Sequence, residues 1–300
     1  MNTRYEIVFA INAEYLPHLS TALLSLLTNN SNERLSVSII NSDIQAQDFS
    51  KIEKMTCNFD CALHDVKVPV ETFEGLPIGH HLEKSTYYRL LIPKLINADR
   101  VLYLDADLIV LNSIAKLLRC ELGSRPVAAV ENPGFGDRKF ALGMSKTAAY
   151  LNAGVMVMNL KYWRELEVSQ KIIDFIANNP EVIEFADQCG INAVLNGNWL
   201  ALPPEYNVQH TFFGGKLPDK YKSIQPILDK AAIMHFTGGG KPWHMLHNHP
   251  YKKLYWFYRK KTPYKSLLPD DFSCINLLRY ISRNYIKKFA KTLSLPLKKS

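Results

Sequence analysis

Short apolar runs alternate with amphipathic stretches along the first hundred residues. Glu6–Ala10, Leu35–Ile40 and Ala62–Val66 are predicted strands. Tyr15–Leu27 and Gln45–Met55 carry apolar residues at helical intervals and are predicted helices. Strands that alternate with helices predict an α/β fold built on a mostly parallel sheet.

The alternation continues through the rest of the chain, without repeats or low-complexity tracts. It ends near Pro250, where we place the boundary of the main domain. The further predicted elements are helices over Ser85–Leu95, Tyr162–Ala177 and Asp187–Leu195, and strands over Arg100–Leu104, Val127–Val130, Asn152–Asn159, Leu200–Pro203 and Ala231–His235.

Two carboxylates, Asp105 and Asp107, follow the strand Arg100–Leu104 directly. Side-chain alternation places both on one side, at the carboxyl edge where open α/β sheets bind ligands. The alternative is a solvated turn, but such turns normally carry Gly, Pro, Asn or Ser, and here the apolar run resumes at Leu108. Buried carboxylates need a partner or a metal ion. The pair therefore predicts an enzyme that holds a nucleotide diphosphate through Mg²⁺ or Mn²⁺.

A second polar segment follows the predicted strand that ends at His235. Gly238–Gly240 let the backbone approach phosphate closely, and Lys241 neutralises it. The spacing and the Ser/Thr of a Walker phosphate loop are missing. His235 is either a core histidine or, with the two carboxylates, the third ligand of a metal site. Its imidazole favours Mn²⁺ over Mg²⁺.

Four other polar residues have both a structural and a functional interpretation. Asn152 either caps its strand or binds a sugar hydroxyl. Asp187 either caps the helix that it begins or, with Gln188, recognises hydroxyls beside an anomeric carbon. Arg89 is either a surface charge on a helix with an apolar opposite face or a ligand for phosphate and sugar.

The net charge of +8 comes from one end of the chain. Residues 251–300 carry thirteen Lys or Arg against two Asp, whereas residues 1–250 carry 23 basic against 26 acidic side chains. Aromatic residues and leucines share this C-terminal tail with the lysines, which predicts a basic amphipathic helix on an anionic membrane surface. A nucleic-acid contact and a plain solvated helix are the alternatives, and we expect no nucleic-acid partner.

Composition also indicates a compartment. Hydrophobic content of 47% is ample for one large core, and five scattered cysteines without a Cys-x-x-Cys pair argue against a zinc ribbon or a disulfide framework. The sequence has no signal-peptide core and no apolar run near the ~18 residues of a membrane span. We therefore expect a cytoplasmic protein, held peripherally on the inner face of the inner membrane.

Over roughly residues 5–250, the chain resembles glycosyltransferase family 8 in six ordered segments: Ile7–Tyr15, Thr86–Leu90, Val101–Asp107, Asn152–Gly154, Asp187–Gln188 and His235–Trp243. The resemblance implies a single catalytic domain with the GT-A fold, a Rossmann-like fold of nucleotide-diphospho-sugar transferases. It implies a retaining, UDP-sugar-dependent hexosyltransferase that moves galactose or glucose. The implied acceptor is a glycan or glycolipid of the lipopolysaccharide or lipooligosaccharide type.

By position, the resemblance assigns a role to each matching residue. Mn²⁺, or Mg²⁺ in its place, would bind Asp105, Asp107 and His235. The acceptor would contact His81 and Glu131, and Asp187 and Gln188 would be catalytic. The donor would contact Ala10, Asn12, Tyr15, Arg89, Asp105, Ala106, Asn152, Ala153, Gly238 and Lys241.

Two positions depart from the family pattern, which usually has Asp at the positions of Asn12 and Glu131. The Asn12 carbonyl still accepts a hydrogen bond from the uracil N3–H. Because the Gln188 carboxamide is a poor nucleophile, we favour same-face attack by the acceptor, with the leaving phosphate oxygen as base. A covalent intermediate on Asp187 is the alternative. Two other functions stay open: a metal-dependent nucleotidyltransferase and a non-catalytic UDP-sugar-binding module.

Overall fold

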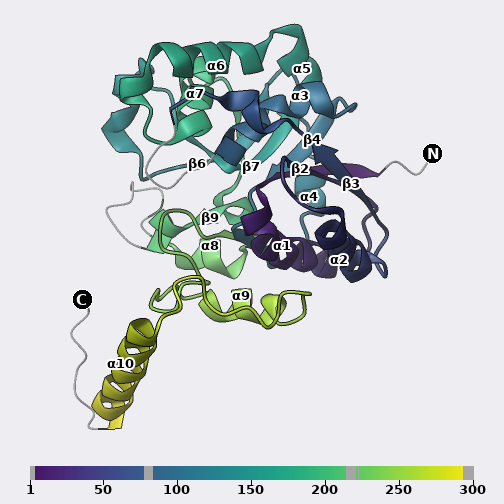
Figure 1. The fold of residues 1–300 in the computed structure, drawn as a ribbon. Coiled ribbons are helices and arrows are strands. Elements are labelled where there is room, and N and C mark those ends of the chain that lie inside the picture. Colours follow the sequence, from purple (N-terminus) through teal and green to yellow (C-terminus); the bar gives the residue numbers. More distant parts are fainter. Residues whose placement is uncertain (1–3, 78–83, 214–220, 222, 293–300) are drawn as a thin grey trace.

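A seven-stranded sheet forms the centre of the molecule (Figure 1). The computed structural model describes residues 4–77, 84–213, 221 and 223–292. In spatial order, the strands are β3 (Cys61–Lys67), β2 (Leu35–Asn41), β1 (Tyr5–Ala10), β4 (Arg100–Leu104), β7 (Leu151–Asn159), β6 (Val127–Glu131) and β8 (Leu200–Ala201).

The sheet is mixed, and its parallel part is the half formed first along the chain. Strands β3, β2, β1 and β4 run parallel to one another, and β6 runs parallel to β8. Strand β7 is antiparallel to both of its neighbours, β4 and β6. The βαβ pattern predicted the parallel half correctly. The reversal at β7 has no signature in its apolar sequence, because the strand is buried on both faces.

Helices cover both faces of the sheet, and alternate residues of each strand belong to different cores. Ile7 and Phe9 of β1 pack with α1 (Leu16–Asn29) and α2 (Ala46–Thr56), whereas Val8 belongs to the core on the other face. The helices of that other face are α3 (Ile92–Leu95), α5 (Leu160–Glu165), α6 (Val168–Asn178) and α7 (Ala186–Leu195), while α4 (Ala115–Leu118) lies with α1 and α2.

A smaller sheet adjoins the first. It consists of β5 (Leu108–Val110), β10 (Ile233–His235) and β9 (Val208–Gln209), with β10 antiparallel to β5 and parallel to β9. The remaining short helices are η1 (Ala13–Tyr15), η2 (Val70–Phe73), η3 (Lys84–Leu91), η4 (Gly136–Leu142), η5 (Pro180–Val182), η6 (Pro204–Tyr206), η7 (His210–Phe213) and α8 (Gln225–Asp229).

Two predicted helices differ from the observed elements. The segment predicted as one helix over Ser85–Leu95 is the 3₁₀ helix η3 followed by a single turn, α3. The segment Tyr162–Ala177 divides between α5 and α6, because Glu167 adopts a left-handed backbone with φ of 49°. A non-glycine residue in this conformation ends the hydrogen-bonded ladder of a helix.

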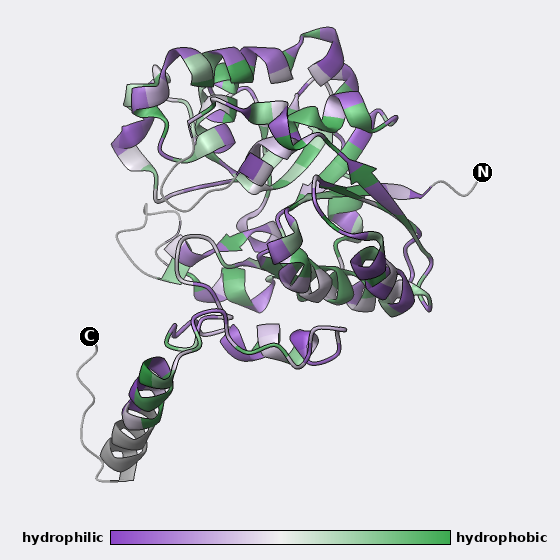
Figure 2. Ribbon diagram, viewed as in Figure 1, coloured by the Kyte–Doolittle hydropathy of each residue, from purple (hydrophilic) through white to green (hydrophobic). Residues whose placement is uncertain are grey.

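The segment expected as a separate tail over residues 251–300 has two parts with different environments. Helix α9 (Lys252–Arg259) packs against α1, and its Tyr255 and Arg259 are buried. Helix α10 (Cys274–Thr292) projects from the body and mixes hydrophobic with hydrophilic residues (Figures 1 and 2). Among the described residues, no helix combines the length and the hydropathy that a membrane crossing requires.

Candidate active site

The two carboxylates lie in the turn that links the large sheet to the small one. Asp105 follows β4 and Asp107 precedes β5. The backbone fixes this turn on both sides, because the Asp105 N–H donates to the Gly154 carbonyl (2.8 Å) and the Phe236 N–H donates to the Asp107 carbonyl (2.9 Å). The acid pair is therefore held at the carboxyl end of β4, where the sequence predicts it.

Strand pairing brings His235 to the acid pair. In the β5–β10 register His235 stands opposite Leu108, the residue after Asp107. Its Nε2 lies 3.0 Å from Asp107 Oδ1 and 3.6 Å from Asp105 Oδ2. Among the described residues, these three side chains form the one group of three or more His, Cys, Asp or Glu ligands whose ligand atoms lie within 4.8 Å of one another.

The backbone at Gly154 leaves room for these ligands. A Cβ at this position would lie 2.2 Å from the His235 Cε1 and 2.5 Å from the Asp105 Oδ2. Only glycine avoids this overlap. Two carboxylates and one imidazole around a space without a side chain fit a divalent cation such as Mn²⁺.

A lysine places a positive charge beside the two carboxylates of the cluster. The Lys241 ammonium pairs with Asp107 and donates to the Phe236 carbonyl (2.8 Å). Burial alone would raise the pKa of Asp107, but Lys241 and His235 together outweigh it and hold that pKa well below its usual range. Asp107 is therefore ionised, as a metal ligand must be.

Asn207 orients the histidine, and sequence reasoning missed it. It is fully buried between Asn152 and His235: its Nδ2 donates to Asn152 Oδ1 (2.8 Å), and its Oδ1 lies 2.9 Å from His235 Nδ1. Since an amide oxygen only accepts, His235 Nδ1 carries the proton directed at Asn207, and Nε2 is the ring nitrogen that faces the acid pair and would be offered to a cation. Asn207 is uncharged and precedes a strand of two residues, β9. Neither feature indicates a functional residue in the sequence.

Arg89 is a buried centre of charge rather than a surface residue. Its guanidinium lies 3.1 Å from Asp105 Oδ1 and 2.9 Å from Asp187 Oδ2, and it donates to the Ala153 carbonyl (2.7 Å). It also stacks over the Tyr103 ring at 4.5 Å. Burial lowers the pKa of Arg89, but the two carboxylates outweigh burial and raise it, so Arg89 stays charged.

Asp187 is not a helix cap. The N-cap of α7 is Phe185, whereas Asp187 lies within the first turn of the helix and is 1% exposed. Burial raises the pKa of Asp187 to about 7, although Arg89 pulls it down. The neighbouring Gln188 accepts a hydrogen bond from the Ala153 N–H (3.0 Å) and donates to the Tyr150 hydroxyl (3.4 Å).

A cavity of about 770 Å³ opens at this edge of the sheet, and most of the predicted site residues line it. Its volume is in the range of small-molecule sites. The predicted residues in its lining are Ala10, Tyr15, Arg89, Asp105, Ala106, Asp107, Asn152, Asp187, Gln188, His235, Gly238 and Lys241.

Three of the predicted site residues that the structure describes do not line this cavity, and a fourth is not described. Asn12 caps η1, where its side chain accepts from the Tyr15 N–H (3.1 Å). Ala153 contributes only backbone groups to Gln188 and Arg89. Glu131 accepts from the Tyr221 hydroxyl (3.1 Å) and lies outside the cavity lining. His81 falls outside the described residues.

Sequence reasoning also missed a carboxylate from the C-terminal part of the chain. Asp270 lines the cavity together with Tyr15 and Trp243. Its Oδ2 lies 3.2 Å from Nε2 of His18, whose ring stacks on Trp243 at a centroid distance of 3.6 Å. The segment after α9 is thus part of the cavity wall.

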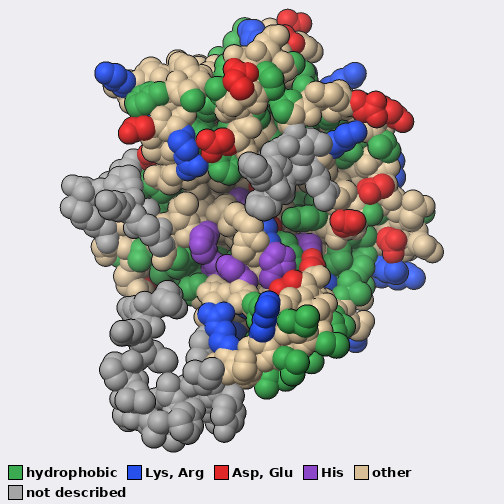
Figure 3. All heavy atoms as spheres, turned by 60° about the vertical axis from the view of Figure 1, so that its left-hand side comes forward, with side chains coloured by type: hydrophobic (Ala, Val, Ile, Leu, Met, Phe, Trp, Pro, Cys, Tyr) green, Lys and Arg blue, Asp and Glu red, His purple; other side chains and the backbone are tan. Residues whose placement is uncertain are grey.

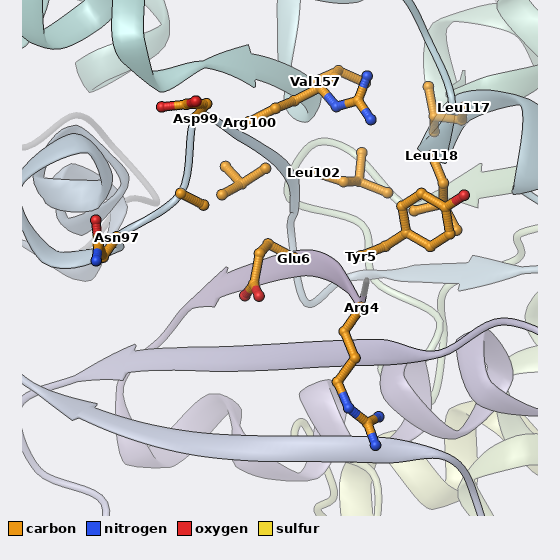
Figure 4. A pocket seen from close by; sticks show the side chains of 12 residues that line it. Arg4, Tyr5, Glu6, Asn97, Asp99, Arg100, Leu102, Leu117, Leu118 and Val157 are labelled. Carbon is orange, nitrogen blue, oxygen red and sulfur yellow. The ribbon is translucent and has the colours of Figure 1, made fainter. Parts of the chain in front are cut away.

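A second cavity of about 740 Å³ lies at the opposite edge of the sheet (Figure 4). Arg4, Tyr5 and Arg100 line it at the amino ends of β1 and β4. Open α/β sheets bind their ligands at the carboxyl ends of the strands. The metal-ligand cluster also lies at that end, so we take the first cavity as the candidate active site.

Comparisons with known proteins agree with this geometry. The model of the family "Glycosyl transferase family 8" matches residues 6–247. The chain is 31% identical over 271 residues to general stress protein A of Bacillus subtilis, covering 87% of this chain and 95% of that protein. It is 28% identical over 278 residues to the lipopolysaccharide 1,2-glucosyltransferase of Escherichia coli, covering 90% and 81%.

A solved structure is similar in fold. The galactosyltransferase LgtC, crystallised with donor and acceptor sugar analogs, superposes with a TM-score of 0.77 at 22% identity. The match covers 89% of this chain and 98% of that one. At this level of identity the likeness establishes the fold, which is the single-domain GT-A fold that the sequence resemblance implied.

Proposed function

Because this chain belongs to glycosyl transferase family 8, we propose that it is a retaining hexosyltransferase that moves galactose or glucose from a UDP-sugar to a glycan acceptor. One observation carries the proposal: Asp105, Asp107 and His235 converge at the carboxyl edge of the sheet with Lys241 beside them. A donor set of this kind favours Mn²⁺, with Mg²⁺ as a substitute.

The proposal gives the residues of the cluster distinct roles in departure of the leaving group. Asp105, Asp107 and His235 would hold the cation, which supplies Lewis-acid stabilisation of the diphosphate when bound. Lys241 neutralises negative charge as it develops on the leaving UDP. Asn207 keeps His235 in the tautomer that leaves Nε2 available.

The sugar and the nucleotide occupy the rest of the cavity in this proposal. Tyr15 offers an aromatic face to the base. Arg89 and Asp187 form a buried ion pair beside Asn152 and Gln188, which supply hydrogen-bonding groups for sugar hydroxyls.

The contacts of Gln188 support same-face attack by the acceptor. Its Oε1 already accepts from the Ala153 N–H, and a carboxamide is a weak nucleophile. Asp187 is the stronger nucleophile, but its Oδ2 is held by Arg89. A glycosyl group trapped on Asp187 and detected by mass spectrometry would overturn this preference.

The test of the function is UDP release from UDP-galactose and UDP-glucose, with and without Mn²⁺. We expect Mn²⁺-dependent release, and a loss of about 100-fold or more in Asp105→Asn and His235→Asn, since the leaving group then lacks its counter-charge. Asp48→Asn, at a surface pair with Lys51, is the matched control. Turnover of nucleoside triphosphates without sugar transfer would instead indicate a nucleotidyltransferase, and tight UDP binding without turnover would indicate a binding module.

We further propose that the protein acts peripherally at the cytoplasmic face of an anionic membrane, on a glycolipid acceptor. The exposed side chains of Arg279 and Arg283 lie among exposed apolar ones. This combination suits a surface that is both apolar and anionic. The name of the Escherichia coli relative supports a lipopolysaccharide-type acceptor. The apolar residues are Leu267, Leu268, Phe272, Ile275, Leu278 and Ile281.

Vesicle sedimentation tests the membrane proposal. Deletion of residues 274–300 and the triple variant Ile275→Ser/Leu278→Ser/Ile281→Ser should both lose binding to anionic vesicles while UDP release from the donor persists. Binding that is unchanged by both, or equal on zwitterionic vesicles, contradicts the proposal.

A further inference from the structure

Three histidines gather beside the active-site cavity without a role in the donor site. The ring centroids of His210, His247 and His249 form a triangle with sides of 6.0, 5.8 and 6.3 Å. Figure 3 shows histidine side chains grouped in the hollow of this face. The triangle touches the cavity wall, because the His210 N–H donates to the Thr237 hydroxyl (3.1 Å) and Thr237 lines the cavity.

Several polar atoms in this cluster lack partners. His249 is only 4% exposed, and its Nε2 has no hydrogen-bond partner among the described residues. The same holds for Nδ1 of His247 and for the hydroxyl of Thr211. Buried polar atoms of native proteins are normally paired, so the unpaired atoms on His247, His249 and Thr211, the residue after His210, indicate a missing ligand.

The electrostatic surroundings of the cluster are cationic. Burial lowers the pKa of His247, and His210, Lys252, His244 and Lys241 lower it further. Burial lowers the pKa of His249 to about 4, with His210 and His247 adding to the shift. Among the described residues, the charged groups that shift these two pKa values are all cationic, so the ligand that fits the cluster is an anion.

The spacing of the rings favours an oxyanion over a metal ion. Among the described residues, only the Asp105, Asp107 and His235 group brings ligand atoms within 4.8 Å of one another, so the three histidines do not converge on one point. A phosphate group has several oxygens, so its donors can be farther apart than the ligand atoms of a single metal ion. Imidazole N–H groups and a hydroxyl are suitable donors to it.

The cluster also adjoins a residue that the family resemblance assigns to the acceptor. Gln209, the residue before His210, donates to the carbonyl of Glu131, which the family resemblance assigns to the acceptor. His247 lies against the glycine segment, since a Cβ on Gly240 would come within 2.2 Å of its Nε2. A ligand at the histidines would thus lie beside the proposed diphosphate site.

We propose that His210, His247, His249 and Thr211 form a subsite for a phosphate group carried by the acceptor. This inference rests on the proposed transferase function and narrows its acceptor to phosphorylated glycans or glycolipids.

The experiment is calorimetric titration of inorganic phosphate into the full-length protein saturated with Mn²⁺ and UDP, so that the donor diphosphate site is already filled. We expect saturable binding that weakens at least tenfold in His210→Asn/His247→Asn. His64→Asn, an exposed histidine on β3, should bind phosphate as the parent does. UDP affinity should be the same in all three proteins.

Each other outcome overturns the subsite. Phosphate that binds only without UDP occupies the donor site, and phosphate binding that ignores both histidines is non-specific. Histidine-dependent binding of Zn²⁺ with no phosphate binding would indicate a metal site. UDP titration into the same proteins tests the donor site separately, so a failed transferase proposal is distinguishable from a failed subsite.

A second measurement tests acceptor recognition. With transfer from the donor as readout, a phosphorylated sugar should be preferred over the same sugar without phosphate by about tenfold in kcat/KM. The double variant should lose this preference while keeping its transfer to the unphosphorylated sugar. An equal preference in both proteins contradicts the proposal.

Discussion

At the scale of single residues, the proposed cation site depends on the side-chain amide of Asn207. Of the three proposed cation ligands, it contacts His235. Asn207 accepts from His235 Nδ1 and is itself fixed by Asn152. Asn207→Ala should weaken Mn²⁺ binding by about 10- to 100-fold, because the imidazole loses its fixed tautomer and orientation. Isothermal titration of Mn²⁺ in the presence of UDP measures this.

Asn198→Ala is the matched control. The Asn198 side chain lies at the surface, where it accepts a hydrogen bond from Arg125 (2.7 Å) and donates a long one to the Tyr162 hydroxyl (3.5 Å). It should leave Mn²⁺ affinity unchanged. Equal weakening in both variants would mean that lost stability, rather than a misplaced imidazole, explains the result.

Functional residues at strand ends were predictable, and those that reach the site from distant segments were not. Asp105, Asp107 and His235 each follow or end an apolar run, so strand alternation and sheet edges were enough to place them together. Asn207 and Asp270 reach the site through packing between distant segments. Local pattern contains no information about such packing.

At the scale of elements, a buried ion pair joins η3 to α7. Arg89 from η3 contacts Asp187 of α7 and Asp105 at the end of β4. Arg89→Met should lower the free energy of unfolding by about 3–5 kcal/mol, because it leaves a buried carboxylate uncompensated. Urea denaturation measures it.

The double variant Arg89→Met/Asp187→Leu should recover part of this loss, since it removes the orphaned charge as well. Arg164→Met is the control, because Arg164 is more exposed and mainly contacts backbone carbonyls. If the double variant is no more stable than Arg89→Met alone, the ion pair is not what joins the two elements.

Helices and strands were predicted correctly where the local hydrophobic pattern matches the way the segment packs. The strands β1, β2 and β4 and the helices α1 and α2 begin and end within a few residues of the predicted bounds. The Ser85–Leu95 segment has helical spacing but forms mainly a 3₁₀ helix that directs Arg89 inward. At Glu167 the chain turns without a glycine, so no residue in the sequence indicates that α5 and α6 are separate helices.

At the scale of the whole molecule, α9 packs against α1 although it lies beyond Pro250, where the sequence predicts the boundary of the main domain. The Tyr255 hydroxyl lies 2.8 Å from His18 Nδ1, and the Tyr258 hydroxyl accepts from Asn29 (2.8 Å). His18 and Asn29 both lie on α1, so these two hydrogen bonds attach α9 to that helix. After α9, the Asp271 carboxylate accepts from the Met245 N–H (2.5 Å).

Two truncations therefore separate the body from the projecting helix. A chain that ends at residue 273 keeps α9 and Asp270 and should melt within about 2 °C of the full chain, because the α10 side chains described are largely exposed. A chain that ends at residue 250 loses two buried tyrosines, each worth about 3–5 kcal/mol by analogy with large-to-small core substitutions. Its Tm should fall by about 10 °C or more.

Donor affinity provides an independent readout of the same boundary. Asp270 and Trp243 line the cavity, His18 stacks on Trp243, and the Tyr255 hydroxyl contacts His18. The chain that ends at residue 273 should therefore bind UDP as the full chain does, whereas Tyr255→Phe should weaken UDP binding without unfolding the protein. Full donor affinity in a chain that ends at residue 250 would show that the first 250 residues form the catalytic domain alone.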